Sequence, residues 1–517
     1  MPYEYYGDGI QDSVKFAQII LPPAKAHPFL YAPLPCWQCR AYTPHRLFFN
    51  RLASALASRG RLVHNASMEF PTWMICLFLF PAGCCVGSFL NVVIWRLPLC
   101  GLKTTFRGVE GRLTLNWPPS HCPVCHAGVR WSWNIPVLSW LLLRGRCAAC
   151  QAPISIRYPL VELGTGLIFA ALYLAYFVTG WYGYIFHSIA YGGPTLALDM
   201  FYAAALLAAA GIDADWFEIP RMIPVLIVAA ALAGVPFGRQ PMLASLAPAS
   251  IPGRLAAGGA VGLLVSIVLL YWRLLPQSFP LETPPTESPD MPDPPEFQPP
   301  VAFSRNWPFL LASGLILLLT AGAWIVLSPP AASLVTLIAG IVLFLIGVLP
   351  RTIQSDDNLA EQVLDEAETP CARREILKEL LFLLPPISLA LLALTIPTPL
   401  PPTPWCGRIL GILFGVLCGG GVIWLIRIGG TLLFGRVAMG MGDVHLMAAI
   451  GAVAGGLPAI VVVFLAAFLA LLWAVVLKIM GRPNVLPFGP WLSVAGILIL
   501  LIGQPILHWY GSLLFPR

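Results

Sequence analysis

The sequence contains about twelve apolar runs close to 20 residues long, which is the length of helix that crosses the hydrocarbon core of a bilayer. Apolar residues make up 58% of the 517 residues and charged residues only 10%, so a water-soluble protein could not cover its surface. The runs are apolar around their whole circumference, which favours helices over barrel strands. The sequence therefore predicts an all-α polytopic membrane protein with about twelve transmembrane helices.

The expected spans are residues 70–95, 158–179, 184–212, 219–237, 255–275, 307–327, 331–349, 380–396, 409–426, 444–459, 461–478 and 486–506. Between the first two lies the only long polar loop of ordinary composition, with eight Lys or Arg residues and Glu110 as its single acid. A loop this cationic belongs on the cytoplasmic side of the membrane. Counting spans from it places Asp213 and Asp443 at that same face.

Five regions follow from this pattern. Residues 1–67 carry seven Lys or Arg on the side where positive charge is disfavoured, so the sequence favours translation beginning at Met68. The regions are an N-terminal extension (1–67), a region with the first span and a four-cysteine loop (68–165), a region of further spans (166–237), a long middle segment (238–404) and a last region of spans (405–517). The middle segment holds about four spans, a Pro-rich acidic loop and a second acidic loop.

Four cysteines in the cationic loop form two CxxC pairs, Cys122–Cys125 and Cys147–Cys150. The gap between the pairs is 21 residues, one beyond the usual zinc-ribbon range. Each pair directs two thiolates to one centre, and four protein ligands make a structural zinc site without an open position. The alternatives are two disulfides or unliganded thiols, although the reducing cytoplasm argues against disulfides. We expect the neighbouring His121 and His126 to be surface residues.

Two short sequences place acidic residues at the membrane face. Asp213 and Asp215 are expected just past the end of a span, and Asp443 follows Gly440 and Gly442 at the start of another. Glycine lets backbones approach closely, and carboxylates beside hydrocarbon are usually functional. Two carboxylates that share one proton can hydrolyse a peptide bond, one as base and the other as acid. From the residues alone, helix caps or the ion site of a transporter remain open alternatives.

Six further segments accompany the two aspartate motifs in the sequence: Gly87–Pro98, Ser120–Cys125, Asn134–Ser139, Arg144–Cys150, Arg157–Glu162 and Pro487–Pro490. With these motifs in this order, the chain resembles the type IV prepilin peptidases, the bifunctional leader peptidases and N-methyltransferases of bacterial pilus and type II secretion systems. The similarity covers residues 70–235 and 405–506, and the combination is specific, whereas each motif alone is weak.

The resemblance implies that Asp213 and Asp443 are the catalytic pair of an aspartyl endopeptidase in the bacterial inner membrane, with Asp215 a supporting acid. Residues 166–237 and 405–517 would be the first and second parts of the aspartyl peptidase domain, and 238–404 an insertion between them. Its substrates would be prepilins or pseudopilins with a short basic leader, cut at the cytoplasmic face. The enzyme would also methylate the new N-terminus with S-adenosylmethionine, and the cysteine loop is associated with that half. Glu162 would be a methylation candidate, with an ion pair to Arg157 as the alternative.

The alternatives to this function are a peptidase without methylation and, in a different class, a transporter that uses the aspartates as an ion site. A transporter would need polar residues near mid-span, and Asp199 is the nearest such residue. The expected partners are the pilin substrates and the lipid bilayer. Nucleic acid is not expected, because topology explains the basic loop and no binding motif accompanies it.

Three features depart from the family pattern. Arg221 stands where an acid is common, His445 stands where a lysine is common, and 230 residues separate Asp213 from Asp443. An even number of spans in the insertion returns the chain to the same face. The expected four extra spans would therefore leave both aspartates cytoplasmic.

Overall fold

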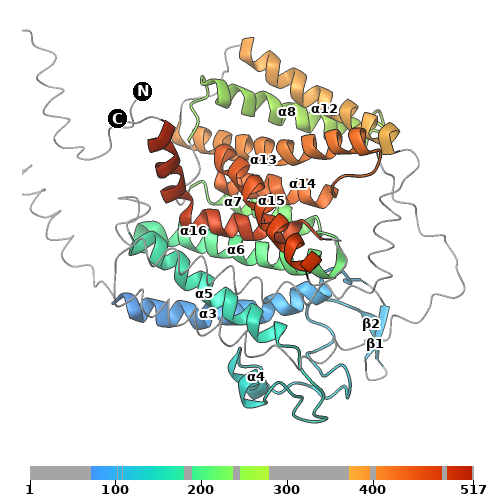
Figure 1. The fold of residues 1–517 in the computed structure, drawn as a ribbon, viewed down its shortest axis with the longest axis vertical. Coiled ribbons are helices and arrows are strands. Elements are labelled where there is room, and N and C mark those ends of the chain that lie inside the picture. The colour runs from blue at the N-terminus through green and yellow to red at the C-terminus, as the bar shows by residue number, and fades with distance from the viewer. Residues whose placement is uncertain are drawn as a thin grey trace, which may run out of the picture. The chain divides into compact units, whose positions relative to one another are not determined.

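A computed structural model describes residues 71–101, 103–106, 109–179, 189–236, 245–276, 278, 372–395, 403–479 and 486–514 (Figure 1). These residues fall within one compact unit, Pro71–Arg517. The expected extension 1–67, the spans 307–327 and 331–349 and most of both acidic loops lie outside the described residues.

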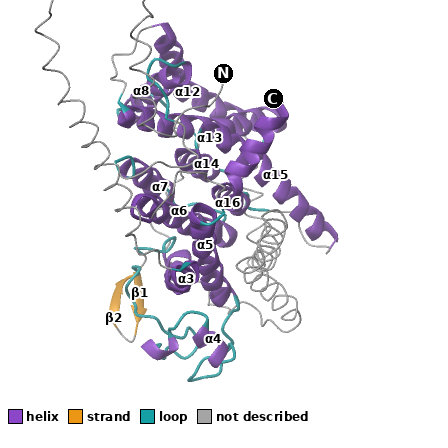
Figure 2. Cartoon of the chain, turned by 90° about the vertical axis from the view of Figure 1, so that its left-hand side faces the viewer, coloured by secondary structure: helices purple, strands orange, loops and turns teal. Residues whose placement is uncertain are grey.

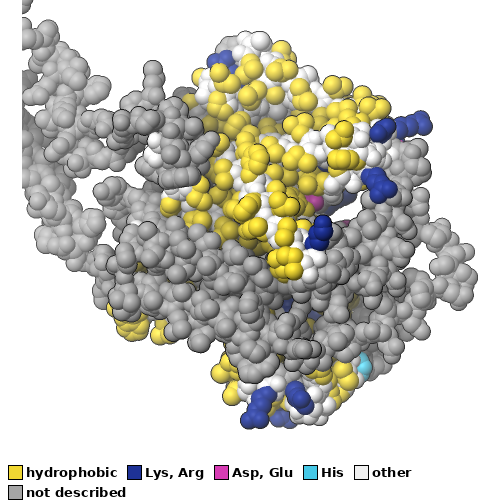
Figure 3. Space-filling view, viewed as in Figure 1, with side chains coloured by type: hydrophobic (Ala, Val, Ile, Leu, Met, Phe, Trp, Pro, Cys, Tyr) yellow, Lys and Arg dark blue, Asp and Glu magenta, His cyan; other side chains and the backbone are white. Residues whose placement is uncertain are grey.

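The predicted helical membrane architecture is confirmed. Within the described ranges, eight helices are long and apolar enough to cross a membrane, and two shorter apolar helices accompany them. The longer helices are α3 (Thr72–Arg96), α5 (Arg157–Phe177), α6 (Ile189–Trp216), α8 (Ile251–Tyr271), α12 (Ala372–Thr395), α13 (Pro404–Phe434), α15 (Gly456–Ile479) and α16 (Gly489–Leu514). Their outer surface is largely apolar, as lipid contact requires (Figure 3).

The two shorter helices differ from the predicted full spans. Predicted span 219–237 becomes α7 (Met222–Ala233, 12 residues), and predicted span 444–459 becomes α14 (Met441–Ala454, 14 residues). Both are shorter than the roughly 20 residues of a full crossing. Gly455 is the C-cap residue of α14, and its φ of +90° favours glycine. Helix α15 begins at the very next residue.

Helix α14 lies at the centre of the packing, against α7, α13, α15 and α16. Its side chains Leu446, Met447 and Ile450 are fully buried. Helix α6 in turn packs against α16, α3, α5 and α7. The elements that carry the two aspartate motifs are therefore internal helices, surrounded by the others (Figure 2).

Very close packing joins α13 to α14. A Cβ atom added to Gly415 would lie 1.9 Å from the Gly451 carbonyl oxygen, and one added to Gly451 would lie 2.0 Å from the Gly415 oxygen. Glycine at both positions lets the two backbones touch, as small residues do where membrane helices cross. This contact fixes α14 against the long helix α13.

The loop between α3 and α5 contains a hairpin and two short helices. Strands β1 (Lys103–Phe106) and β2 (Val109–Arg112) pair antiparallel, with Lys103 opposite Arg112. A 3-10 helix (Trp131–Trp133) and α4 (Leu138–Leu142) follow. The four cysteines lie in the turns around them.

Candidate active site and metal centre

Asp213 lies in the C-terminal part of α6. The helix continues to Trp216, so Asp213 and Asp215 lie within it and not past its end as expected. Asp213 is 6% exposed. Its Oδ2 atom accepts a hydrogen bond of 3.0 Å from the backbone N–H of Gly489, at the start of α16.

Gly489 belongs to the segment Pro487–Pro490, for which the sequence offered no individual role. A Cβ atom at this position would lie 2.6 Å from Asp213 Oδ2 and 2.9 Å from Ile219 Cδ1. Only glycine therefore lets the α16 backbone approach the carboxylate this closely. The start of α16 is the third element of the site.

Asp443 lies in the first turn of α14, where the helix dipole favours a negative charge. It is 8% exposed. Gly440 is the N-cap residue with an ordinary φ of −65°. Gly442 is packed tightly, since a Cβ atom there would lie 3.1 Å from Cβ of Ile219. The close approach expected of the two glycines thus occurs at Gly442.

The two aspartates come together although 230 residues separate them in the chain. Their carboxyl groups lie close enough for their charges to interact, and Ile219 contacts both Gly442 and Gly489 beside them. Two carboxylates in a buried site cannot both ionise freely, so such a pair tends to share a proton. This arrangement can supply an acid and a base to the same bond.

Asp215 has a different environment from Asp213. Arg157 donates hydrogen bonds to both of its carboxylate oxygens, at 2.7 and 2.6 Å, and to the carbonyl oxygen of Gly211. This charge-assisted pair ties the start of α5 to the end of α6.

Glu162, which is 8% exposed, accepts a 2.6 Å hydrogen bond from the backbone N–H of Val137 at the start of α4. Val137 has a φ of +60°, an uncommon conformation for a β-branched residue. Glu162 thereby anchors the loop to α5, and Arg157, its alternative ion-pair partner, binds Asp215 instead.

Three further residues considered from the sequence have defined surroundings. Asp199 is buried in α6 and accepts a 2.8 Å hydrogen bond from the Tyr176 hydroxyl, so it joins α6 to α5. Arg221 and His445, which both depart from the family pattern, lie close enough to interact electrostatically. Among the described residues, no contact places either side chain between Asp213 and Asp443.

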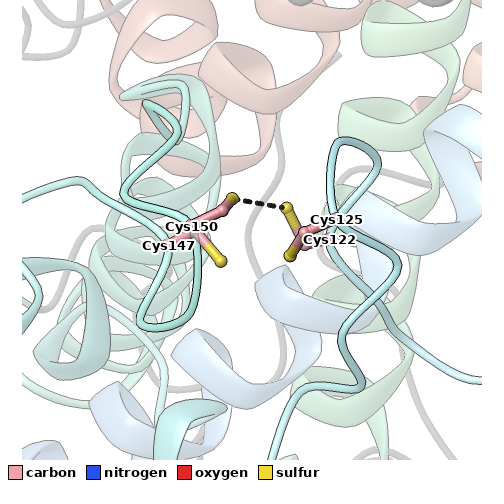
Figure 4. A group of neighbouring side chains, drawn as sticks. All are labelled: Cys122, Cys125, Cys147 and Cys150. Carbon is pink, nitrogen blue, oxygen red and sulfur yellow. Dashed lines mark hydrogen bonds between the residues drawn. The ribbon is translucent and has the colours of Figure 1, made fainter.

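The four cysteines of the loop converge on one point (Figure 4). Their sulfur atoms all lie within 4.8 Å of one another, and the Sγ atoms of Cys122 and Cys150 are 3.8 Å apart. A tetrahedral site with metal–sulfur bonds of about 2.3 Å has sulfur–sulfur edges of about 3.8 Å. The cluster therefore fits a four-coordinate metal ion.

The two CxxC turns have the same backbone geometry. In each turn, the backbone N–H of the first cysteine donates to the carbonyl oxygen of the residue five positions later, over 2.9 Å for Cys122 and 2.8 Å for Cys147. The residue after the second cysteine, His126 or Gln151, has a positive φ and donates to the carbonyl oxygen of the first. Two equivalent turns thus present two thiols each, and the metal-binding group among the described residues contains no histidine.

The electrostatics of the thiols agree with metal binding. Backbone N–H groups, of Cys150 first and then of Ala149, lower the pKa of Cys147 to about 7. The Ala152 N–H lowers the pKa of Cys150, but burial and the other three thiols outweigh it and raise this pKa to about 12. Four clustered thiols cannot all ionise beside one another, and a divalent cation removes that obstacle.

Comparison with known proteins gives the family. Residues 82–176 match the bacterial peptidase A24 N-terminal domain, and residues 372–475 match the type IV leader peptidase family. The prepilin leader peptidase/N-methyltransferase of Dickeya chrysanthemi is 37% identical over 221 residues, which are 40% of this chain and 69% of that protein. The protein of the same name from Klebsiella pneumoniae is 36% identical over 200 residues, 38% of this chain and 75% of that protein. The chain therefore belongs to the type IV leader peptidase family.

Other relatives of the prepilin leader peptidase family align over less of their length. The type 4 prepilin-like proteins leader peptide-processing enzyme of Escherichia coli O78:H11 is 44% identical over 165 residues, 31% of this chain and 56% of that protein. Asp443 lies inside the second matched region and Asp213 lies between the two. The second match begins at residue 372, inside the segment 238–404, so the insertion's boundaries remain a prediction. No solved structure matches the chain.

Sequence motifs alone assigned no individual role to Gly489. The motif Pro487–Pro490, which contains it, is the signal that points to this residue.

Proposed function

We propose that this protein is a membrane-embedded aspartyl endopeptidase that removes the basic leader of type IV prepilins or pseudopilins at the cytoplasmic face of the bacterial inner membrane. The observation that supports it is the meeting of Asp213 and Asp443 at one buried place, from two motifs far apart in the chain. The names of the relatives supply the substrate class.

The geometry supports different roles for the two carboxyl groups of the pair. One carboxylate takes a proton from the attacking water, and the other, protonated, donates to the oxygen of the scissile carbonyl. The Gly489 N–H orients the Asp213 carboxyl group, and the start of α14 stabilises charge on Asp443. The surrounding apolar helices exclude bulk water, which strengthens these interactions.

We propose that the same protein methylates the new N-terminus, with S-adenosylmethionine as the methyl donor and Glu162 as a candidate residue of that site. The cysteine cluster would hold a structural zinc ion, because four thiolates in a reducing compartment suit zinc and leave no position for substrate. The zinc would fix the two CxxC turns, while Glu162 anchors the same loop to α5.

Leader cleavage of a co-expressed prepilin tests the proposal. Asp213→Asn and Asp443→Asn keep the side-chain volume and remove the titrating carboxyl group, so each should lower cleavage by at least about a thousandfold. Asp199→Asn is the matched control, since Asp199 is a buried acid of the same helix α6 that contacts Tyr176. It should cut within about threefold of the wild type.

Mass spectrometry of the product separates the outcomes. A product that carries one added methyl group supports both activities, and a trimmed, unmethylated product supports the peptidase alone. Full cleavage by both Asn variants would refute the aspartyl mechanism. An inactive wild type would refute the substrate assignment.

A further inference from the structure

A fully buried ion pair joins α12 to α13. Glu379 of α12 is 1% exposed and Arg427 of α13 is 4% exposed. The Arg427 Nη2 atom lies 3.1 Å from Glu379 Oε1, and Nε donates to both carboxylate oxygens at 3.2 and 3.4 Å. Trp424, one turn before Arg427, donates its indole N–H to Glu379 Oε2 at 2.6 Å.

Such a pair adds little net stability, because desolvating two charges costs about as much as their attraction returns. Charged side chains that are buried among membrane helices are rare and are usually functional. Glu379 accepts hydrogen bonds from two side chains, Trp424 and Arg427, whereas the Nη1 atom of Arg427 donates to a different acceptor. We therefore look for the role of the ion pair in the contact that Nη1 makes.

The Nη1 atom of Arg427 donates a hydrogen bond to the carbonyl oxygen of Met439. Met439 directly precedes Gly440, the N-cap of α14, so this bond holds the chain at the entrance to the Asp443 turn. One turn along α13, the Thr431 hydroxyl accepts from the Ala438 N–H at 3.1 Å. Helix α13 thus fixes two consecutive residues of the loop.

The same guanidinium charge also reaches Asp443 electrostatically. Arg427 therefore lies between the carboxylate of α12 and the first turn of α14. The chain of contacts runs from Glu379 through Arg427 to the Met439 carbonyl and the Asp443 turn. Arginine suits this task because its planar fork serves several acceptors in fixed directions, which lysine cannot do.

We propose that Glu379 and Arg427 are positioning residues for Asp443, and that α12 is consequently part of the catalytic unit although it lies in the segment 238–404 expected to be an insertion. The proposal rests on the proposed peptidase function. Glu379 aims the guanidinium, and the guanidinium sets the backbone from which Asp443 projects.

Cleavage kinetics of the purified full chain with a prepilin substrate test this role. Glu379→Gln keeps the shape and removes the charge, and it should lower kcat by at least about tenfold with KM changed less than about twofold. Arg427→Lys should behave alike, because it keeps the charge and loses the fork. Glu379→Asp, which restores the charge, should recover part of kcat.

Glu375→Gln is the matched control, since Glu375 lies one turn earlier on α12 and pairs with Lys378 at 2.6 Å. Its kcat should equal that of the wild type. Hydrogen exchange gives a readout independent of cleavage: amides of residues 438–443 should exchange faster in Glu379→Gln, while those of α3 and α5 stay unchanged.

The outcomes separate the two proposals. A wild type that does not cut refutes the proposed function, and the positioning role falls with it. A cutting wild type with an unaffected Glu379→Gln variant refutes the positioning role alone. Equal losses in Glu375→Gln and Glu379→Gln, or faster exchange throughout the bundle, would mean that the pair only supports folding and would also refute it.

Discussion

At the residue scale, the site depends on a backbone that comes within hydrogen-bond distance of a carboxylate. Gly489 donates to Asp213, and the absence of a Cβ atom makes that approach possible. A carboxylate held by a backbone donor has a fixed orientation, which an acid–base pair needs.

Gly489→Ala should therefore lower cleavage by at least about tenfold, because the new methyl group would displace either the Asp213 carboxylate or Ile219. Leader cleavage in vivo, normalised to membrane-inserted protein, measures this. Gly421→Ala is the control, because nothing lies within 4 Å of its added Cβ atom. Equal activity of the two variants would show that the approach of α16 to Asp213 is dispensable.

The sequence predicts individual residues of the site only in part. Asp213, Asp443 and the cysteine quartet stand out, because acids beside apolar runs and paired CxxC turns are rare without a function. The partners of Asp215 and Glu162 could not be predicted, because both depend on how α4, α5 and α6 meet. Hydrogen bonds between distant elements leave no local pattern.

At the element scale, helix existence follows from hydropathy but helix ends do not. Predicted span 409–426 stops at Arg427, whereas α13 continues to Phe434. Predicted span 380–396 begins after Glu379, whereas α12 begins at Ala372. Each charge ends an apolar run in the sequence, but in the fold the two charges neutralise each other, so both helices pass through them.

The contact of α13 with α14 gives a test at this scale. Gly415→Ala should force the two helices apart, since the added Cβ atom meets the backbone of α14. It should lower the free energy of unfolding in detergent by about 1–3 kcal/mol or more, which a thermal unfolding experiment measures. Gly429→Ala on the same helix has open space and should be neutral or stabilising by up to about 1 kcal/mol. A stable Gly415→Ala variant would contradict this packing.

The two CxxC turns give a second test. The purified chain should contain one zinc ion, and Cys125→Ser should lose it, because three thiolates bind zinc far more weakly than four. Elemental analysis measures the metal. Cys100→Ser, an exposed cysteine of the same loop outside the cluster, should keep it. Zinc retained after Cys125→Ser, or absent from the wild type, would refute the assignment.

At the scale of the whole molecule, the orientation of the described helices remains a prediction from the cationic loop. It requires positions that flank Asp213 and Asp443 to lie on one face. Single cysteines introduced at Glu218 and Arg436, in a background without other reactive cysteines, should be labelled from the cytoplasm by an impermeant maleimide. Labelling from opposite sides would exclude a shared active site.

The site is closed by a contact between residues that are 276 positions apart, Asp213 and Gly489. During synthesis, α6 enters the membrane long before α16 exists. At about 5–20 residues per second, a ribosome needs roughly 15–55 s to travel from one to the other. Until then the Asp213 carboxyl group lacks the backbone donor that orients it. We therefore expect a newly made chain to gain full cleavage activity only after α16 has inserted.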